Sequence, residues 1–448
     1  MPLSDLVAYD LDFQSESIEY RTPMKFGGRV VDGVDLVTVT CKAENRASKR
    51  AVGGGSMTMG VAWAWPSPAI ESDQKLAAVL SLAKKIVENA ATDVVSGHPL
   101  DICVELGERR AGLAEQVRQE FGLSESIPEL AILMAASPLE AALFDAHGKA
   151  CQTSSYQLLG KDHLPNDLGV YLGSDFQGLR LDSFVSAEPQ AKMPLYHLVG
   201  ALDPLVPSEV EKPVGDHLPE DLAAWIERDG LSHLKIKLSG DDLDWDVRRV
   251  LEVSKVADQS TRGAAAEWAF SLDFNERCQD EAYVLEMLDR VAGTDEKSLE
   301  RVQYIEQPTH RDLQAHPENT MHRVAERLPV VIDESLLGLP SLMLAREQGY
   351  SGVALKACKG HAEALLMGAA AQHLGLYLCV QDLTCVGMSL LHSASLAAHI
   401  PTVAAIESNG RQYCPAGNDA WRERFPGMFD VQGGTVPTAL LNGPGLGY

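Results

Sequence analysis

The stretch LKIKLSG at residues 234–240 places two lysines, Lys235 and Lys237, around one isoleucine in an apolar segment. Side chains of a β-strand alternate between its two faces, so both ammonium groups would point to the same side. Like charges on one face repel each other, and lysine is seldom buried without a partner. The segment therefore predicts a strand whose paired lysines have a chemical role.

Short apolar segments of this kind alternate with helical segments from about residue 190 to residue 411. There are eight, and most are followed by a stretch with helical periodicity. They are MPLYHLV, HLKIKL, WAFSLDF, VQYIEQP, PVVIDES, SGVALKA, LYLCVQD and VAAIES. This alternation predicts an α/β fold with a (β/α) barrel over residues 190–411.

The first 160 residues follow a different pattern, which predicts an α+β domain. The β-rich stretches are SESIEYRTPMKF, VDLVTVTCKAE and GSMTMGVAWAW, separated by the turn-rich stretches GGRVVDG and ENRASKRAVGGG. The helical stretches are DQKLAAVLSLAKKIVENAA, AGLAEQVRQEF and PLEAALFDAHGKA. The GGGS run at 53–56 is interpreted as a flexible loop, because it lacks the Lys-Ser/Thr of a phosphate loop.

Three further segments lie outside these patterns. Residues 412–448 form a Gly/Pro-rich tail, which we expect to pack on the first domain. Residues 166–192 precede the first barrel strand, and residues 201–219 follow it. Connections after a barrel strand open on the catalytic face, so the segment 201–219 could form a wall of a substrate site.

The composition narrows the function classes. The chain has 448 residues and a net charge of -25, which argues against a nucleic-acid or anionic-membrane surface. We expect no signal peptide and no membrane span, because the N-terminus lacks a basic and apolar leader and no stretch approaches about 18 uncharged apolar residues. The eight cysteines are scattered without CxxC pairs and indicate reduced, mostly buried thiols of a cytoplasmic protein.

Acidic residues end three successive predicted strands, at Asp273, Glu306 and Asp333. The carboxyl ends of barrel strands converge on one mouth, where three acids would repel each other unless a hard cation lay between them. Oxygen-only ligation of this kind suits Mg²⁺. The alternative is that these acids cap the following helices or form structural ion pairs with the lysines.

Lys237 and Lys356 end predicted strands on opposite sides of the mouth. One could remove the α-proton of a carboxylate substrate bound to Mg²⁺ and the other could return it. Free lysine, with a pKa of about 10.4, is a poor base at neutral pH, but a neighbouring cation such as Lys235 would lower that pKa. Lys359 is the alternative to Lys356 if the strand ends later than expected.

The segments LKIKLSG, LDFNE, IEQP, IDES and ALKACKG, in this order, resemble the enolase superfamily, and in particular its muconate-lactonizing-enzyme subgroup of the mandelate racemase/muconate lactonizing enzyme family. The resemblance covers nearly the whole chain. It implies a modified TIM-type (β/α)7β barrel with an N-terminal α+β capping domain. It also implies one Mg²⁺ per active site, replaceable by Mn²⁺, on Asp273, Glu306 and Asp333. The acid/base pair would be Lys237 and Lys356, with Lys235 as the neighbour that tunes the pKa.

Some features depart from that subgroup. The strand-eight sequence AIESNGRQY lacks the Asp-x-Asp that dipeptide epimerases use for a substrate ammonium, and strand seven carries Asp382 rather than a histidine. The sequence has Gly360-His361 where the family commonly has a Gly-Gly pair. The missing Asp-x-Asp argues against dipeptide epimerisation, and Asp382 in place of a histidine argues against a His/Asp catalytic dyad.

Other candidates have two interpretations each. Asp382 and Glu407 could contact substrate or form salt bridges at the mouth, and Lys25 and Arg29 could reach a substrate carboxylate or lie in a solvated turn. Residues beside the ligands, Asn275 and Glu334, could support them or serve the turn. The remaining candidates are expected to be structural: Trp63 and Trp65 in the sheet of the first domain, and His392 and His399 on a helix.

The sequence thus predicts a Mg²⁺-dependent racemase or epimerase that acts on a small-molecule carboxylate. A lyase that expels a β-leaving group, as in dehydration of an acid sugar, would use the same intermediate. A non-catalytic ligand-binding barrel is the rival from another class. We also expect a homo-oligomer, and no nucleic-acid or membrane partner.

Overall fold

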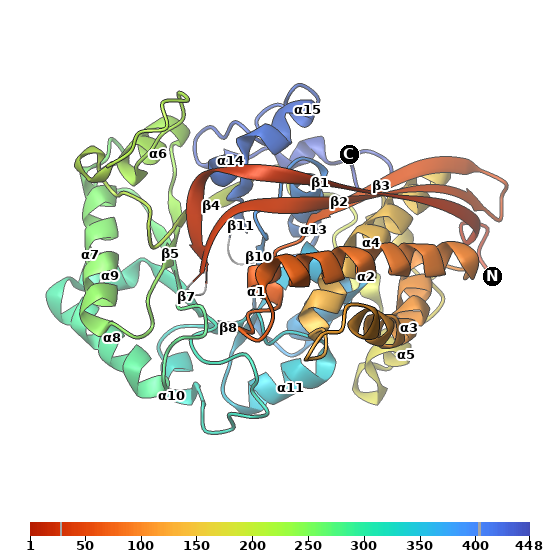
Figure 1. Ribbon diagram of the computed structural model, residues 1–448, viewed down its shortest axis with the longest axis horizontal. Coiled ribbons are helices and arrows are strands. Elements are labelled where there is room, and N and C mark those ends of the chain that lie inside the picture. The colour runs from red at the N-terminus through yellow and green to blue at the C-terminus, as the bar shows by residue number, and fades with distance from the viewer. Residues whose placement is uncertain (27–28, 402–404) are drawn as a thin grey trace.

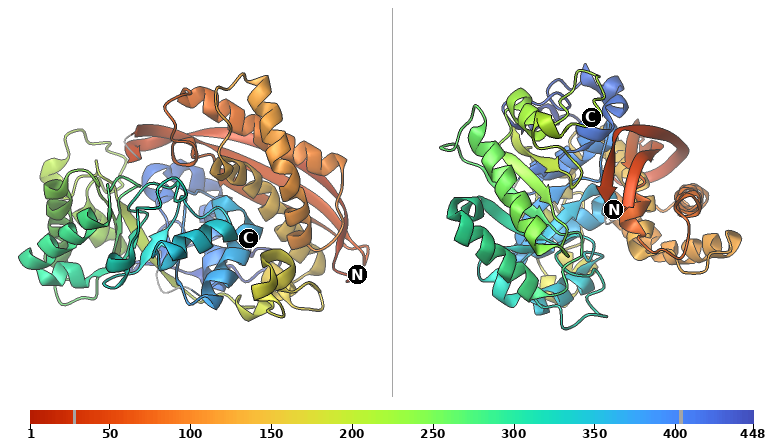
Figure 2. Two further views of the ribbon diagram at one scale, coloured as in Figure 1. Left: turned by 90° about the horizontal axis from the view of Figure 1, so that it is seen from below. Right: turned by 60° about the vertical axis from the view of Figure 1, so that its left-hand side comes forward.

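The computed structural model of the chain places a three-stranded sheet and three long helices beside a closed barrel (Figure 1). It describes residues 1–26, 29–401 and 405–448, and no side chain of residues 25–29. Figure 2 shows the sheet and the long helices gathered on one side of the barrel. We call this N-terminal unit the cap.

The cap sheet is antiparallel, with the order β1-β2-β3. Its strands are β1 (Leu6–Phe26), β2 (Arg29–Asn45) and β3 (Arg50–Thr58). The turn-rich interpretation of GGRVVDG is wrong for most of its length, because β2 begins at Arg29 and pairs there with the end of β1. Alternate residues of β2, such as Val37, Val39 and Cys41, are buried against the helices, which is what period-two patterning requires.

Helices α2 (Ser72–Thr92) and α4 (Glu129–Cys151) pack against this sheet, and α3 (Pro99–Glu120) packs against both of them. The interpretation of GGGS as a flexible loop is wrong, because Gly53 and Gly55 lie in β3 against α4. A Cβ on Gly55 would be 2.2 Å from the Pro138 carbonyl oxygen. By length and composition α4 could cross a membrane, but it is fully buried and forms the core of the cap.

The barrel consists of eight parallel strands and closes through pairing of the last with the first. The strands are β4 (Met193–Val199), β5 (His233–Lys237), β6 (Ala269–Asp273), β7 (Val302–Glu306), β8 (Val330–Ile332), β9 (Gly352–Lys356), β10 (Tyr377–Gln381) and β11 (Ile406–Glu407). Helices follow the first seven: α6 (Leu222–Asp229), α7 (Leu243–Gln259), α8 (Glu281–Thr294) with α9 (Glu296–Glu300), α10 (His322–Ala325), α11 (Leu339–Glu347), α12 (His361–His373) and α13 (Met388–His399). The predicted (β/α)7β barrel with an α+β cap is confirmed.

Shorter elements connect these layers. They are α1 (Val61–Ala64), α5 (Leu168–Leu172), α14 (Gly410–Tyr413), α15 (Asp419–Arg422) and β12 (Thr435–Val436), which pairs antiparallel with β4. The C-terminal tail returns to the cap, where the Leu446 amide donates to Asp145 at 3.0 Å and the Tyr448 hydroxyl donates to the Gly54 carbonyl at 3.2 Å.

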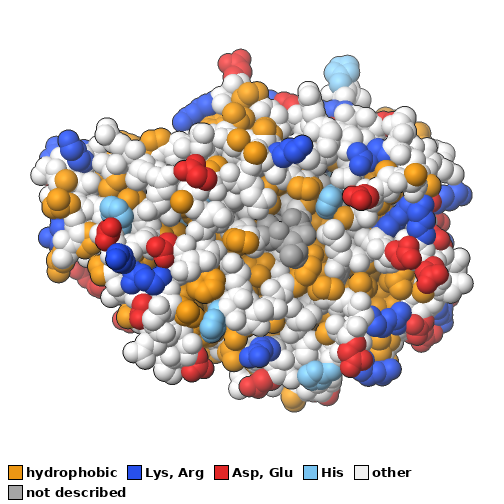
Figure 3. Space-filling view, turned by 180° about the vertical axis from the view of Figure 1, so that it is seen from behind, with side chains coloured by type: hydrophobic (Ala, Val, Ile, Leu, Met, Phe, Trp, Pro, Cys, Tyr) orange, Lys and Arg blue, Asp and Glu red, His pale blue; other side chains and the backbone are white. Residues whose placement is uncertain are grey.

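The surface carries both signs of charge. On the face shown in Figure 3, lysine and arginine side chains lie interspersed with aspartate and glutamate. All eight cysteines are free thiols and seven are buried, as the sequence predicts.

Candidate active site

Charged side chains meet at the carboxyl ends of the barrel strands. Lys237, Asp273, Glu306, Lys356 and Glu407 are the last residues of their strands. Asp333 and Asp382 directly follow β8 and β10. All seven are at most 4% exposed, so this is a buried cluster, and it contains the strand-end residues that the sequence singled out.

Lys235 lies at the centre of the cluster. Its Nζ is 2.9 Å from Glu306, 3.0 Å from Glu407 and 3.2 Å from Asp273. Burial alone would lower the pKa of this lysine, but the three carboxylates outweigh burial and raise the pKa well above its ordinary value. The observed partners of Lys235 are therefore acids. That Lys235 lowers the pKa of Lys237 stays a prediction.

Lys237 and Asp273 form a direct hydrogen-bonded ion pair between β5 and β6. Burial would raise the pKa of Asp273, but the ammonium groups of Lys237 and Lys235 hold that pKa well below its ordinary value. The Asn275 backbone N–H also donates to Asp273, at 2.9 Å. Lys237 lines a cavity of about 550 Å³ together with residues such as Trp245.

On the side of the mouth opposite Lys237, two lysine ammonium groups contact the Asp333 carboxylate. The Lys356 Nζ is 2.7 Å from its Oδ2, and the Lys359 Nζ is 3.2 Å from its Oδ1. These ammonium groups overcome the effect of burial and hold the pKa of Asp333 well below its ordinary value. Strand β9 ends at Lys356, as expected, while Lys359 lies in the following turn and donates to the Asp333 carbonyl.

Trp63 of the cap also reaches this acid, and sequence reasoning missed it. Its indole N–H donates to Asp333 Oδ2 at 3.3 Å, and the Lys356 Nζ lies 4.8 Å from its ring centroid. The expectation that Trp63 packs within the cap sheet is wrong. Trp65 does stay in the cap, where its indole donates to Glu125 at 2.6 Å.

The remaining acids are strongly affected by burial. Burial and the charge of Asp273 raise the pKa of Glu306 to about 7. Burial and the charge of Glu407 raise the pKa of Asp382 to about 8, and burial with the charge of Asp333 raises that of Glu334. In the described mouth, six buried carboxylates face four buried lysines (Asp273, Glu306, Asp333, Glu334, Asp382 and Glu407; Lys235, Lys237, Lys356 and Lys359).

The carboxylates of Asp273, Glu306 and Asp333 are the groups that could hold Mg²⁺. Three carboxylates on adjacent strands offer hard oxygen donors, and Asp333 Oδ1 accepts no hydrogen bond, although the Lys359 ammonium lies 3.2 Å from it. Among the residues that the structure describes, however, no three such side chains converge as a metal site. Lys235 contacts both Asp273 and Glu306 and occupies the space between them. The donor chemistry fits Mg²⁺, while in this structure lysine ammonium groups contact all three carboxylates.

The C-terminal half of the chain shows which family the protein belongs to. Residues 217–448 match the model of the family described as enolase C-terminal domain-like. The chain belongs to this family. No curated protein matches the chain. The match of residues 217–448 confirms the resemblance to the enolase superfamily. The solved structures that resemble the chain include a muconate lactonizing enzyme and a mandelate racemase/muconate lactonizing protein.

Three solved structures illustrate the likeness. The dipeptide epimerase of Enterococcus faecalis V583, complexed with Mg and the dipeptide L-Leu-L-Tyr, is 16% identical, with a TM-score of 0.63 over 99% of both chains. The muconate lactonizing enzyme of Pseudomonas fluorescens is 17% identical, with a TM-score of 0.59 over 98% of this chain and 95% of that one. The N-succinyl Arg/Lys racemase of Bacillus cereus is 15% identical, with a TM-score of 0.60 over 100% and 95%. At these identities the likeness shows the fold alone.

Two candidate substrate-binding acids of this enolase-type mouth, Asp382 and Glu407, accept hydrogen bonds from other groups of the protein. Asp382 accepts from the backbone N–H groups of Cys385 and Asn409, at 3.2 and 3.3 Å. Glu407 accepts from Lys235 and from the Asn409 side chain. Their substrate roles stay predictions, as do the supporting roles of Asn275 and Glu334. The side chains of Lys25 and Arg29 lie outside the described residues.

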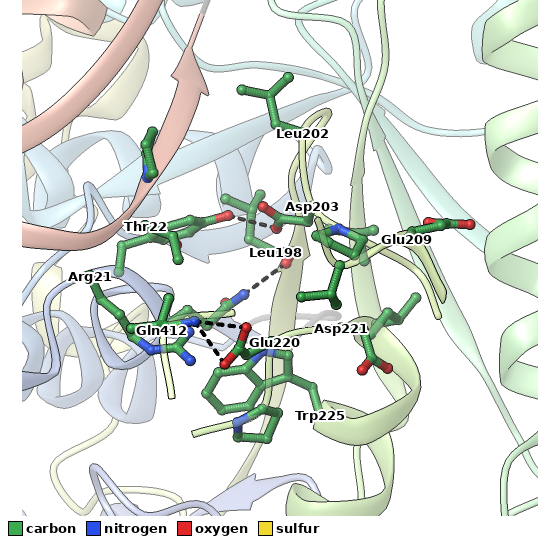
Figure 4. Close-up of a pocket in the computed structure, with 18 of the residues that line it drawn as sticks. Arg21, Thr22, Leu198, Leu202, Asp203, Glu209, Glu220, Asp221, Trp225 and Gln412 are labelled. Atoms are coloured by element: carbon green, nitrogen blue, oxygen red, sulfur yellow. Dashed lines mark hydrogen bonds between the residues drawn. The ribbon is translucent and has the colours of Figure 1, made fainter. Parts of the chain in front are cut away.

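The segment 201–219 forms a wall of a cavity beside the mouth of this enolase-family barrel. The cavity measures about 520 Å³ and lies between this segment, the end of β4 and the cap strand β1 (Figure 4). Arg21 of β1 pairs with Asp216 through two hydrogen bonds and donates to the Leu218 carbonyl at 3.1 Å. The cap is thus tied to this segment, while a substrate in the cavity stays a prediction.

Proposed function

We propose that the protein is a Mg²⁺-dependent racemase or epimerase that removes the α-proton of a small-molecule carboxylate and returns it to the same carbon. Family membership and neighbours that are epimerases, racemases and cycloisomerases support an enzyme with isomerase-type chemistry. The racemase reaction, its substrate and its metal are the parts that we propose.

The observation that carries the proposal is the placement of two lysines on opposite barrel strands. Lys237 ends β5 and Lys356 ends β9, four strands further around the ring. Each contacts its own carboxylate, Asp273 or Asp333. A substrate carbon held between the two lysines would have one ammonium or amine on each face, which is what proton removal and return require.

In its ion pair with Asp333, Lys356 is protonated. Burial would lower its pKa, but the Asp333 carboxylate outweighs burial and raises the pKa above its ordinary value. Lys356 would accept a proton only when Asp333 binds something else. Lys237 would act on the other face.

Asp273, Glu306 and Asp333 would hold Mg²⁺, or Mn²⁺ in its place. When bound, the ion would stabilise the negative charge that develops on the substrate carboxylate as the α-proton leaves. Enclosure of the mouth supports the same chemistry, because exclusion of water strengthens each electrostatic contact inside it.

The test is proton exchange in D₂O. The purified protein with Mg²⁺ would be incubated with pools of N-acyl amino acids, dipeptides and sugar acids, beside a Lys237→Ala/Lys356→Ala double variant. A gain of one mass unit in one compound, absent with the variant, is the expected result. Loss of water would instead indicate the dehydratase. Absence of both, together with no Mg²⁺ binding by calorimetry, would contradict the proposal.

We also propose that the protein is a homo-oligomer in the cytoplasm. Light scattering of the purified protein would measure its mass against the 48.5 kDa of one chain. A monomer at all concentrations would contradict that part alone.

A further inference from the structure

Trp63 is the point at which the cap enters the barrel mouth. It lies in α1, directly after β3, and is 1% exposed. The Arg311 guanidinium donates to its carbonyl at 2.9 Å and is itself paired with Glu276. The backbone of Trp63 is thus fixed to the loop that follows β7, and its side chain is directed at the reactive cluster.

Trp63, Lys356 and Asp333 form a closed set of three contacts. The Asp333 Oδ2 accepts from the indole N–H at 3.3 Å and lies 2.7 Å from the Lys356 Nζ. The same ammonium lies 4.8 Å from the indole ring centroid, within the range of a cation–π contact. The indole therefore restrains both members of the ion pair.

The two parts of the indole have separable effects. A lysine ammonium on four flexible methylenes is poorly fixed by one carboxylate, whereas a rigid aromatic face restricts where it can lie. The ring face acts on Lys356, and the N–H orients the oxygen that Lys356 contacts. Lys237 lies at the end of a strand on the opposite side of the barrel. A substitution at Trp63 should therefore affect Lys356 more than Lys237.

We propose that Trp63 is a positioning residue for Lys356, which makes docking of the cap a condition for reaction on the face that Lys356 serves. The inference rests on the proposed function, because it assumes that Lys356 exchanges a proton with substrate. It goes beyond that function by assigning a residue of the cap to one of the two faces.

The first test needs no substrate. The chain has six tryptophans, and the Trp63→Phe variant identifies the Trp63 indole N–H in a ¹⁵N–¹H spectrum. Lys356→Met removes the nearer of two ammonium groups over the ring, since the Lys359 Nζ lies 5.9 Å from the same centroid, and is expected to shift this resonance. Lys149→Met, a lysine near Tyr448, is the control and should leave it in place. An unchanged Trp63 resonance in Lys356→Met would overturn the inference.

The second test uses any pooled compound that exchanges its α-proton. Single Lys237→Ala and Lys356→Ala variants define which stereoisomer each lysine serves. Trp63→Leu should then slow exchange of the Lys356 stereoisomer by about 10- to 30-fold, and Trp63→Phe by less, because it keeps a ring. The other stereoisomer should change by less than about threefold.

Trp65→Phe is the matched control. Trp65 directly follows α1, the helix in which Trp63 lies, but its indole N–H donates to Glu125 inside the cap. Equal loss for both stereoisomers in Trp63→Leu would indicate a merely structural residue and overturn the inference. If the wild-type protein exchanges no compound, expels no water and binds no Mg²⁺, the proposed function fails, and the indole resonance still decides whether Trp63 restrains Lys356.

Discussion

Lys235 on β5 donates a hydrogen bond to Glu407 on β11, with 3.0 Å between Nζ and Oε2, although 172 positions separate them in the chain. The same ammonium contacts Glu306 and Asp273 on the other side. The two lysines of LKIKLSG can both be buried on one face of the strand because acids from other strands face them. Three carboxylates that would otherwise repel each other share Lys235.

Removing that ammonium should destabilise the fold. In Lys235→Met the acids Asp273, Glu306 and Glu407 lose a buried partner, and breaking a buried ion pair typically costs about 3–5 kcal/mol. We expect the free energy of unfolding at pH 8 to fall by about this amount, as measured with urea. If the three strand-end carboxylates hold Mg²⁺, saturating Mg²⁺ should restore part of the loss.

Lys297→Met is the matched control. Its ammonium pairs with Asp258 at 3.3 Å, but the side chain is 42% exposed, so its loss should cost less than about 1 kcal/mol. A Lys235→Met variant as stable as the control would show that the acids are satisfied without Lys235.

The tight contact between β3 and α4 predicts a contrast between neighbouring glycines. In Gly55→Ala the new Cβ would lie 2.2 Å from the Pro138 carbonyl oxygen and 2.6 Å from the Ala142 nitrogen, and neither backbone atom can move freely. In Gly54→Ala it would meet only the flexible Met388 side chain, at 2.9 Å from sulfur. We expect Gly55→Ala to lose about 3 kcal/mol of unfolding free energy or to fail to fold, and Gly54→Ala to lose less than about 1 kcal/mol. Thermal unfolding of both variants would check this, and equal losses would contradict it.

The barrel strands could be predicted because short apolar runs end in polar residues, a local pattern. Trp63 could not be predicted, because GVAWAW alternates like a strand. Instead β3 ends at Thr58, whose hydroxyl donates to the carbonyl of Leu383, 325 positions away, and α1 begins at Val61. Likewise, the sequence placed Lys235 and Lys237 on one face but could not show which acids face them. Those partners depend on closure of the ring, which brings β11 back to β4.

Buried histidines should make the protein sensitive to acid. His392 is fully buried on α13, with its Nε2 2.9 Å from the Nδ1 of His361, and burial lowers its pKa to about 3. Below about pH 6.5 the unfolded chain takes up a proton there and the folded chain does not, so stability falls as the pH falls. Between pH 6.5 and 5.0 this one residue should remove about 2 kcal/mol.

His392→Gln keeps a polar partner for His361 but does not titrate. Its unfolding free energy should therefore fall less over that pH range, by about 2 kcal/mol, than that of the wild-type protein. His310→Gln, at an exposed position, should leave the slope unchanged. Urea titrations at both pH values would measure the slopes, and parallel slopes for His392→Gln and wild type would contradict the assignment.

The ion pair between Arg21 and Asp216 should control how firmly the segment 201–219 is held. Arg21 is only 6% exposed in its side chain and reaches both Asp216 oxygens and the Leu218 carbonyl. Arg21→Met removes all three contacts at once. We expect amide deuterium exchange in this segment to become about tenfold faster, as measured by mass spectrometry of its peptides.

The pH dependence of this contact has a defined sign. The hydrogen bond from Arg21 holds the pKa of Asp216 below its ordinary value, so the contact should persist above pH 4 and weaken only as the pH falls through the lowered value. Arg50→Met, which removes a guanidinium that is 81% exposed, is the control and should leave the segment unchanged. If Arg21→Met leaves exchange in the segment at the wild-type rate, then contacts within the barrel domain, such as Glu220 with the amides of Val214 and Gly215, hold the segment without the cap.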